Sequence, residues 1–113
     1  MKKTIVVGAV AYDAKVVPIW EGIRAYFQDA GVPLDFVLFS NYEAQVEALF
    51  SRFIDVAWNT NLAFVKTDRR LNGQSKVLAM RDTDLEFTSK IVVREESGIT
   101  ALSHIKGKRM AFG

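Results

Sequence analysis

The sequence predicts an α/β protein with a mostly parallel open sheet and helices on both faces of that sheet. Three observations predict this fold: short β-branched runs, helical stripes of apolar residues between them, and turn residues at each change of period. Strand and helix patterns alternate up to Trp58. Alternation of this kind requires crossover connections, which are right-handed in nearly all known sheets.

Size and composition narrow the possible classes. The chain has 113 residues, of which 50% are hydrophobic and 25% are charged, as in one globular domain. The net charge of +2, from 15 basic and 13 acidic residues, is too small to imply a nucleic-acid partner. Because the chain has no cysteine and a single histidine, we expect no disulfide, no metal site and no cofactor.

The first strand and helix have clear signals. Residues 5–7 form a β-branched run inside an expected strand at residues 4–10, buried on both faces as in a parallel sheet. An apolar stripe at helical spacing follows: Val16, Trp20, Ile23, Phe27 and Ala30. Pro18 falls in the first turn of this helix, where proline is tolerated, and Gly31 fits a left-handed cap after its end.

The next elements repeat this order. Leu34–Phe39 is the second strand, and Ser40 with Glu43 fits a capping box that would make Ser40 the cap of the second helix. The apolar residues of that helix are Val46, Leu49, Phe50 and Phe53. A third strand is expected at residues 54–58, and a third helix begins over residues 62–66.

The remainder of the chain has weaker patterns. Residues 69–74 form a polar loop and residues 95–98 form a turn. A short helix is expected at residues 100–105. Further strands are expected at residues 76–80, 88–93 and 109–112.

Polar and aromatic side chains gather where the three predicted strands end. In an open parallel sheet, ligands bind outside the carboxyl ends of the strands, and the N–H groups of the following helices favour an anion. Large aromatics among neutral polar groups describe a small-molecule pocket. The candidate ligand-binding residues at these ends are Tyr12, Tyr42, Trp58, Asn59, Thr60 and Asn61.

Each candidate also has an ordinary structural interpretation. Asparagine and threonine are common helix caps, tyrosines occur on surfaces, and Trp58 is a plausible core residue. No catalytic residue is expected, because the chain lacks a dinucleotide fingerprint, a phosphate loop and a nucleophile beside a base. His104 has no carboxylate or serine partner near it in the sequence and is interpreted as an exposed helix residue.

Two segments carry a family resemblance. One is Asp55-Val56-Ala57-Trp58 in the third strand, and the other is Leu102 with the closing run Lys106-Gly107-Lys108-Arg109-Met110-Ala111-Phe112-Gly113. In this order and separation they resemble the phosphate/phosphonate-binding family of ABC-transporter substrate-binding proteins, which have the type II periplasmic-binding fold. The resemblance extends over nearly the whole chain.

The resemblance implies a two-lobed binding protein and no enzymatic reaction. Residues 1–90 would form the first lobe, and residues 91–113 would form the crossover and the first strand of an incomplete second lobe. Tyr12, Tyr42 and Trp58 match positions that line the family's cleft. The implied partners are a small anionic ligand (phosphate, phosphonate or a related oxyanion) and a membrane ABC permease, and the implied location is the periplasm.

Two alternatives stay open from the sequence: a cytoplasmic biosynthetic enzyme of the same fold, and an effector-sensing domain like those of LysR-type regulators. Lys2 and Lys3 precede an apolar segment at residues 5–11, but this segment is short for a signal peptide and is needed as the first strand. A cytoplasmic location is therefore also considered. If the chain is complete as given, unpaired sheet edges predict a dimer.

Overall fold

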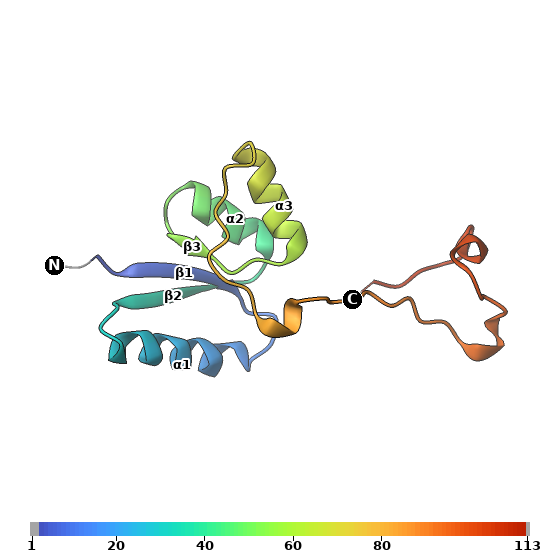
Figure 1. The fold of residues 1–113 in the computed structure, drawn as a ribbon, viewed down its shortest axis with the longest axis horizontal. Coiled ribbons are helices and arrows are strands. Elements are labelled where there is room, and N and C mark those ends of the chain that lie inside the picture. Colours follow the sequence, from blue (N-terminus) through green and yellow to red (C-terminus); the bar gives the residue numbers. More distant parts are fainter. Residues whose placement is uncertain (1–2, 113) are drawn as a thin grey trace. The chain divides into compact units, whose positions relative to one another are not determined.

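The computed structural model describes residues 3–112, in two compact units divided between Lys76 and Val77. The first unit contains all the strands and α-helices of the described chain (Figure 1): β1 (Ile5–Val10), α1 (Val16–Asp29), β2 (Leu34–Phe39), α2 (Tyr42–Phe50), β3 (Val56–Ala57) and α3 (Asn61–Arg70). The second unit contains three short 3₁₀ turns: Asp82–Asp84, Glu95–Ser97 and Leu102–Ile105. No helix within residues 3–112 has both the length and the apolar character needed to cross a membrane.

The three strands form one parallel sheet in the order β2-β1-β3. Ile5 lies opposite Leu34 on one side of β1, and Val7 lies opposite Val56 on the other. Because the chain moves from β1 to β2 in one direction and from β2 to β3 in the other, right-handed crossovers place α1 and α2 on opposite faces. Figure 1 shows α1 on one side of the sheet and α2 with α3 on the other, which confirms the predicted fold class.

The face of the sheet that α1 covers is an apolar core. Its buried members come from β1, α1 and β2 and are Val7, Ala9, Val16, Trp20 and Leu34. Ile23 and Phe27 pack against this cluster, as the helical stripe predicts. Ala30 does not belong to the stripe, because α1 ends at Asp29 and Ala30 is its exposed C-cap. Gly31 follows with φ +76°, the left-handed cap that was predicted.

The opposite face of β1 packs closely at Gly8, which is buried. A Cβ atom added to Gly8 would lie 2.5 Å from Cδ1 of Ile54 and 3.0 Å from Cε2 of Phe39. Ile54 is only 2% exposed, so its side chain has little room to move. Gly8 therefore lets the segment after α2 approach the central strand without an intervening side chain.

We expect Gly8→Ala to lower the free energy of unfolding by about 1–3 kcal/mol, because the added methyl group overpacks a filled space. Gly22→Ala is the matched control, since an added Cβ at this exposed position of α1 meets nothing within 4 Å. The control should gain about 1 kcal/mol from helix propensity. Urea unfolding of both variants measures the difference, and equal stabilities would contradict the close packing at Gly8.

The N-cap of α2 is Asn41 and not the predicted Ser40. Oδ1 of Asn41 accepts a hydrogen bond from the backbone N–H of Ala44 at 2.8 Å, and the Asn41 backbone is extended. The capping-box prediction was wrong by one residue because an asparagine caps as well as a serine. Glu43 then falls in the first helical turn, where a carboxylate interacts favourably with the helix dipole.

Asn41→Ala should cost about 1 kcal/mol of stability through the lost cap, whereas Ser40→Ala should cost less than about 0.5 kcal/mol. Thermal unfolding of the two variants distinguishes the capping residue. A larger loss of stability in Ser40→Ala than in Asn41→Ala would show that Ser40 is the capping residue after all.

The end of α2 also differs from the prediction. The helix stops at Phe50, and Phe53 lies outside it with 63% of its surface exposed. Arg52 adopts φ +60°, and the N–H of Phe53 donates to the carbonyl of Ala48 at 2.9 Å. This is a Schellman ending built on arginine, so the sequence offers no glycine to reveal it.

The third strand is shorter than predicted: it covers Val56–Ala57 instead of residues 54–58. Asp55 extends the pairing by its side chain, since Oδ2 accepts from the N–H of Val6 at 3.0 Å while the N–H of Asp55 donates to the carbonyl of Val6 at 2.8 Å. Nζ of Lys3 lies 3.2 Å from Oδ1. The Val6 hydrogen bond first, and Lys3 second, lower the pKa of Asp55 from its ordinary value of 3.8.

Because the pKa of Asp55 is lowered in the folded state, its contribution to stability is complete above the unfolded-state pKa and is lost as the pH falls through the folded-state value. Asp55→Asn should therefore flatten the fall in unfolding free energy below pH 3.8. Urea midpoints at a series of acid pH values measure this slope. Parallel curves for the variant and the parent would show that Asp55 does not carry it.

The three strands predicted at residues 76–80, 88–93 and 109–112 are wrong in the described structure, where these segments are irregular. A strand needs a neighbour for its backbone N–H and carbonyl groups, and none of these segments pairs with another in residues 3–112. Residues 91–93 and 108–110 nevertheless line one cavity of about 80 Å³ in the second unit. The predicted helix at residues 100–105 is reduced to the 3₁₀ turn Leu102–Ile105.

Candidate ligand-binding site

The strand order reverses between β1 and β3, and in open parallel sheets ligands bind beyond the carboxyl ends of the strands at such a reversal. The N–H of Trp58 donates to the carbonyl of Gly8 at 2.8 Å, and the N–H of Ala11 donates to the carbonyl of Phe39 at 2.9 Å. These bonds hold the ends of all three strands at one edge of the sheet. The loops that leave this edge are therefore neighbours in space, although they are far apart in the sequence.

Trp58 packs against a core residue but is itself partly exposed at this edge. It follows Val56 by two positions and so lies on the same face of the sheet, the face covered by α1. Its ring meets the ring of Trp20 edge-on at a centroid distance of 6.2 Å, and Trp20 in turn lies 6.2 Å from Phe36. Because Trp58 remains 37% exposed, part of its ring is open to a ligand.

The next three residues have different roles. Oδ1 of Asn59 accepts a hydrogen bond of 2.8 Å from Nε2 of Gln45, which lies on α2 and is fully buried. Oγ1 of Thr60 accepts from the N–H of Ala63 at 3.4 Å, so Thr60 is the N-cap of α3. Asn61 is the first residue of that helix and is exposed.

Gln45 is the residue at this edge that sequence reasoning missed. Its side chain is 0% exposed and bonds both to Asn59 and to the carbonyl of Trp58. A glutamine inside a helix carries no motif, and its burial depends on the close approach of α2 to Gly8. No sequence signal could have separated it from a solvent-exposed glutamine.

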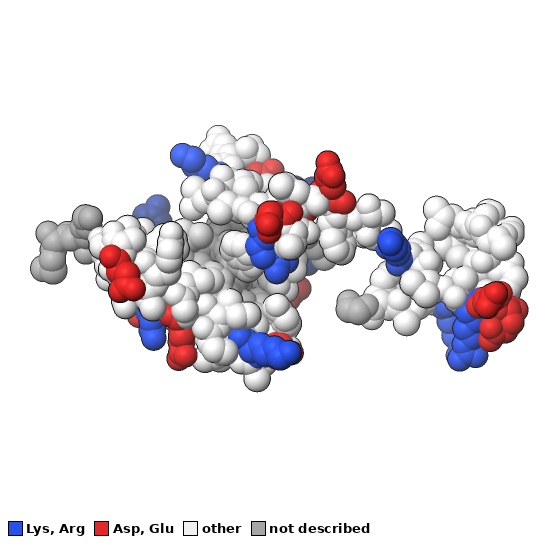
Figure 2. Space-filling model, turned by 60° about the horizontal axis from the view of Figure 1, so that its bottom comes forward, with Lys and Arg blue, Asp and Glu red and all other residues white. Residues whose placement is uncertain are grey.

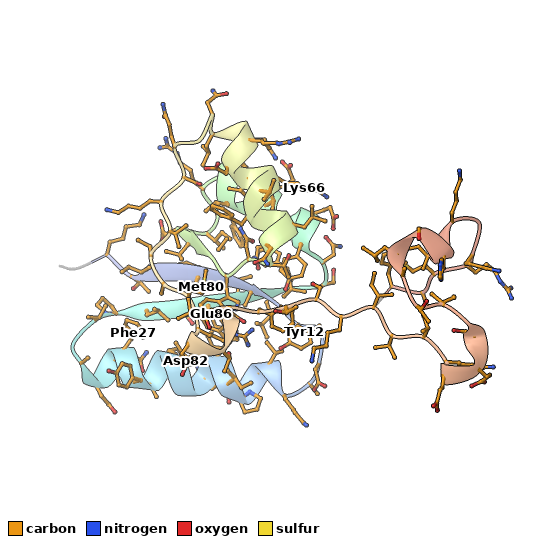
Figure 3. The ribbon with its side chains drawn as sticks, turned by 45° about the vertical axis from the view of Figure 1, so that its right-hand side comes forward. Tyr12, Phe27, Lys66, Met80, Asp82 and Glu86 are labelled. Carbon is orange, nitrogen blue, oxygen red and sulfur yellow. The ribbon has the colours of Figure 1, made fainter. Side chains whose placement is uncertain are left out.

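Tyr42 and Thr60 both line a groove between α2 and α3. The groove has a volume of about 430 Å³ and mixes apolar and charged side chains: Tyr42, Glu43, Val46, Glu47, Thr60, Leu62, Ala63, Lys66, Arg69 and Arg70. Ion pairs join its walls, from Lys66 to Glu43 at 3.7 Å and from Arg70 to Glu47 at 2.5 Å. Lys66 extends from α3 (Figure 3). These pairs are more than 40% exposed and contribute little to stability.

Tyr12 is not brought against the other candidates. It lies in the loop after β1, at the opposite end of α1 from Phe27 (Figure 3), and is 77% exposed. It makes no ring contact or hydrogen bond within residues 3–112. Trp58, Asn59, Thr60 and Asn61 are thus consecutive from the end of β3 to the start of α3, and Tyr42 lines the same groove as Thr60. Tyr12 lies apart from them in the loop after β1.

The chemistry available at this edge is hydrogen bonding and apolar contact. The carboxyl groups whose pKa is lowered are Asp35, Asp55 and Asp84, each through a hydrogen bond to a nearby N–H or arginine, and none belongs to the strand-end loops. Within residues 3–112, no group of histidine and carboxylate side chains is arranged to hold a metal ion. On the face seen in Figure 2, acidic and basic side chains are interspersed.

Comparison with known protein families gives a match over nearly the whole chain. The family described as "ABC transporter, phosphonate, periplasmic substrate-binding protein" matches residues 6–113. Neither the curated proteins nor the solved structures that were compared give a match. The match includes both units and every candidate residue at the strand ends.

Proposed function

This chain belongs to the phosphonate-binding family of ABC-transporter periplasmic substrate-binding proteins, and on that premise we propose that it captures a small anionic ligand for transport. Phosphate, phosphonate or a related oxyanion is the proposed ligand class. The family is one of transport proteins and not of enzymes. Capture therefore needs no bond to break, only contacts that favour the bound state.

The observation that carries the proposal is the meeting of neutral hydrogen-bonding groups and an exposed indole face at the reversal of strand order. Trp58 and Asn59 leave β3 directly beside the end of β1. Neutral donors bind an anion without carrying a counter-charge, provided that their positions are fixed. The proposed ligand-binding residues are Tyr12, Tyr42, Trp58, Asn59, Thr60 and Asn61.

The proposed mechanism is closure of two lobes over the ligand. We assign residues 1–90 to the first lobe and residues 91–113 to the crossover and the first strand of the second. A ligand that contacts both lobes stabilises the closed state by its higher affinity for that state. The proposed partner that receives the ligand is a membrane ABC permease, and the proposed location is the periplasm.

Binding of inorganic phosphate and methylphosphonate, measured by calorimetry and by tryptophan fluorescence, tests this function. The wild-type protein should bind at least one of the two anions with a change in emission, because Trp58 is 37% exposed at the site. Trp58→Phe should remove most of that change and weaken binding about fivefold through lost contact area.

Tyr26→Phe is the control, since Tyr26 lies on α1, is 72% exposed and keeps its ring in this variant. It should bind as the wild type does. A wild-type protein that binds neither anion would overturn the proposed function, and an unchanged signal in Trp58→Phe would remove Trp58 from the site.

A further inference from the structure

The buried amide of Gln45 connects α2 to the loop that carries the candidate site. Its Nε2 donates two hydrogen bonds of 2.8 Å, one to the backbone carbonyl of Trp58 and one to Oδ1 of Asn59. The side chain of Gln45 is 0% exposed, whereas Asn59 is only half-buried. The buried amide of Gln45 therefore fixes the orientation of the partly exposed side chain of Asn59.

The direction of these bonds is fixed by chemistry. A backbone carbonyl only accepts hydrogen bonds, so Gln45 must turn its N–H end toward Trp58. The same NH₂ group also faces the side chain of Asn59, so the atom of Asn59 that accepts its hydrogen bond must be the oxygen Oδ1. Nδ2 of Asn59 consequently points away from Gln45, and it has no hydrogen-bond partner within residues 3–112.

Packing alone does not explain an amide at position 45. Oε1 of Gln45 is buried and has no hydrogen-bond partner among the described residues. A buried acceptor without a partner costs about 1–3 kcal/mol. An apolar side chain of similar size would fill the space beside Gly8, where Cγ of Gln45 packs, without that cost. What an apolar side chain could not supply is the pair of hydrogen bonds that Nε2 donates.

We propose that Gln45 is a positioning residue that turns the N–H end of Asn59 toward the ligand. The ligand must then present a hydrogen-bond acceptor to Asn59, as an oxygen of a phosphonate or phosphate does. The inference rests on the proposed function, because it assigns a role within that same site. It adds to that function which partner donates in one ligand contact, namely the N–H end of Asn59, and it names Gln45 as the buried residue that orients this group.

The variant Asn59→Asp tests whether residue 59 donates a hydrogen bond to the ligand. The aspartate keeps one oxygen as the acceptor for Gln45 but replaces the outward N–H groups by a charged oxygen, so affinity for inorganic phosphate or methylphosphonate should fall about ten- to a hundredfold. Asn72→Asp is the control with the same charge change. Asn72 is exposed beyond the end of α3, where its left-handed backbone tolerates aspartate. The affinity of the Asn72→Asp variant for the same anion should differ from that of the wild type by less than about threefold. Equal affinities of Asn59→Asp and wild type would overturn the inference.

A double-mutant cycle separates positioning from a merely structural role. Gln45→Met should weaken anion binding about tenfold when Asn59 is present and by less than about twofold in the Asn59→Ala background, since the lost orientation then has no group to act on. Equal weakening in both backgrounds would contradict the positioning role. Melting temperatures of all four proteins confirm that the comparison is made between folded chains.

Side-chain amide NMR without any ligand distinguishes failure of this inference from failure of the proposed function. The NH₂ protons of Gln45 should exchange slowly with solvent and those of Asn59 rapidly. Rapid exchange at Gln45 would overturn the inference even if the protein binds anions. If the exchange pattern is as expected but the wild type binds neither anion, the proposed function is overturned, and so is the proposed contact between Asn59 and the ligand.

Discussion

The close approach of α2 and its following segment to β1 at Gly8 is the contact on which the arrangement of the site depends. Because Gly8 has no side chain, Ile54 and Gln45 fill the space above the central strand. Because Gln45 packs so close to β1, its Nε2 lies 2.8 Å from the carbonyl oxygen of Trp58. The other face of β1 is an ordinary apolar core and imposes no such polar constraint on the loops.

The sheet topology adds the second constraint. With the order β2-β1-β3, the helices that follow β1 and β3 lie on opposite faces of the sheet (Figure 1), and ligands of open parallel sheets bind between strand ends related in this way. Trp58 closes one side of this edge of the sheet through its contact with Trp20, and Asn59 lies on the side that Gln45 reaches. An apolar wall and an oriented amide thus follow from two adjacent residues of one loop, because neighbouring residues point to opposite faces.

Sequence patterns predicted what local residues determine. Leu34–Phe39 has the predicted bounds, and the stripe from Val16 to Phe27 packs as expected, because each depends on its own apolar period. The family match over residues 6–113 likewise agrees with the motifs that carried the resemblance. The cap at Asn41 was missed because two adjacent residues had equal capping ability, and only the backbone decides between them.

What could not be predicted depends on contacts between distant residues. Gln45 is buried because Gly8 leaves room for it, and the sequence separates them by more than one element. The apolar runs at residues 88–93 and 109–112 are strands by composition, but backbone pairing requires a neighbour that the described chain does not provide. Tyr12 has the right position in the chain, at the end of β1, yet its orientation depends on a loop that no periodicity describes.

A crystal structure of the protein with bound methylphosphonate would show whether Asn59 presents its N–H end to the anion. An oxygen of the anion should lie at about 2.7–3.2 Å from Nδ2 of Asn59, while Oδ1 of Asn59 still accepts the hydrogen bond from Gln45. An anion bound elsewhere, or one that meets the oxygen end of Asn59, would contradict the proposed contact.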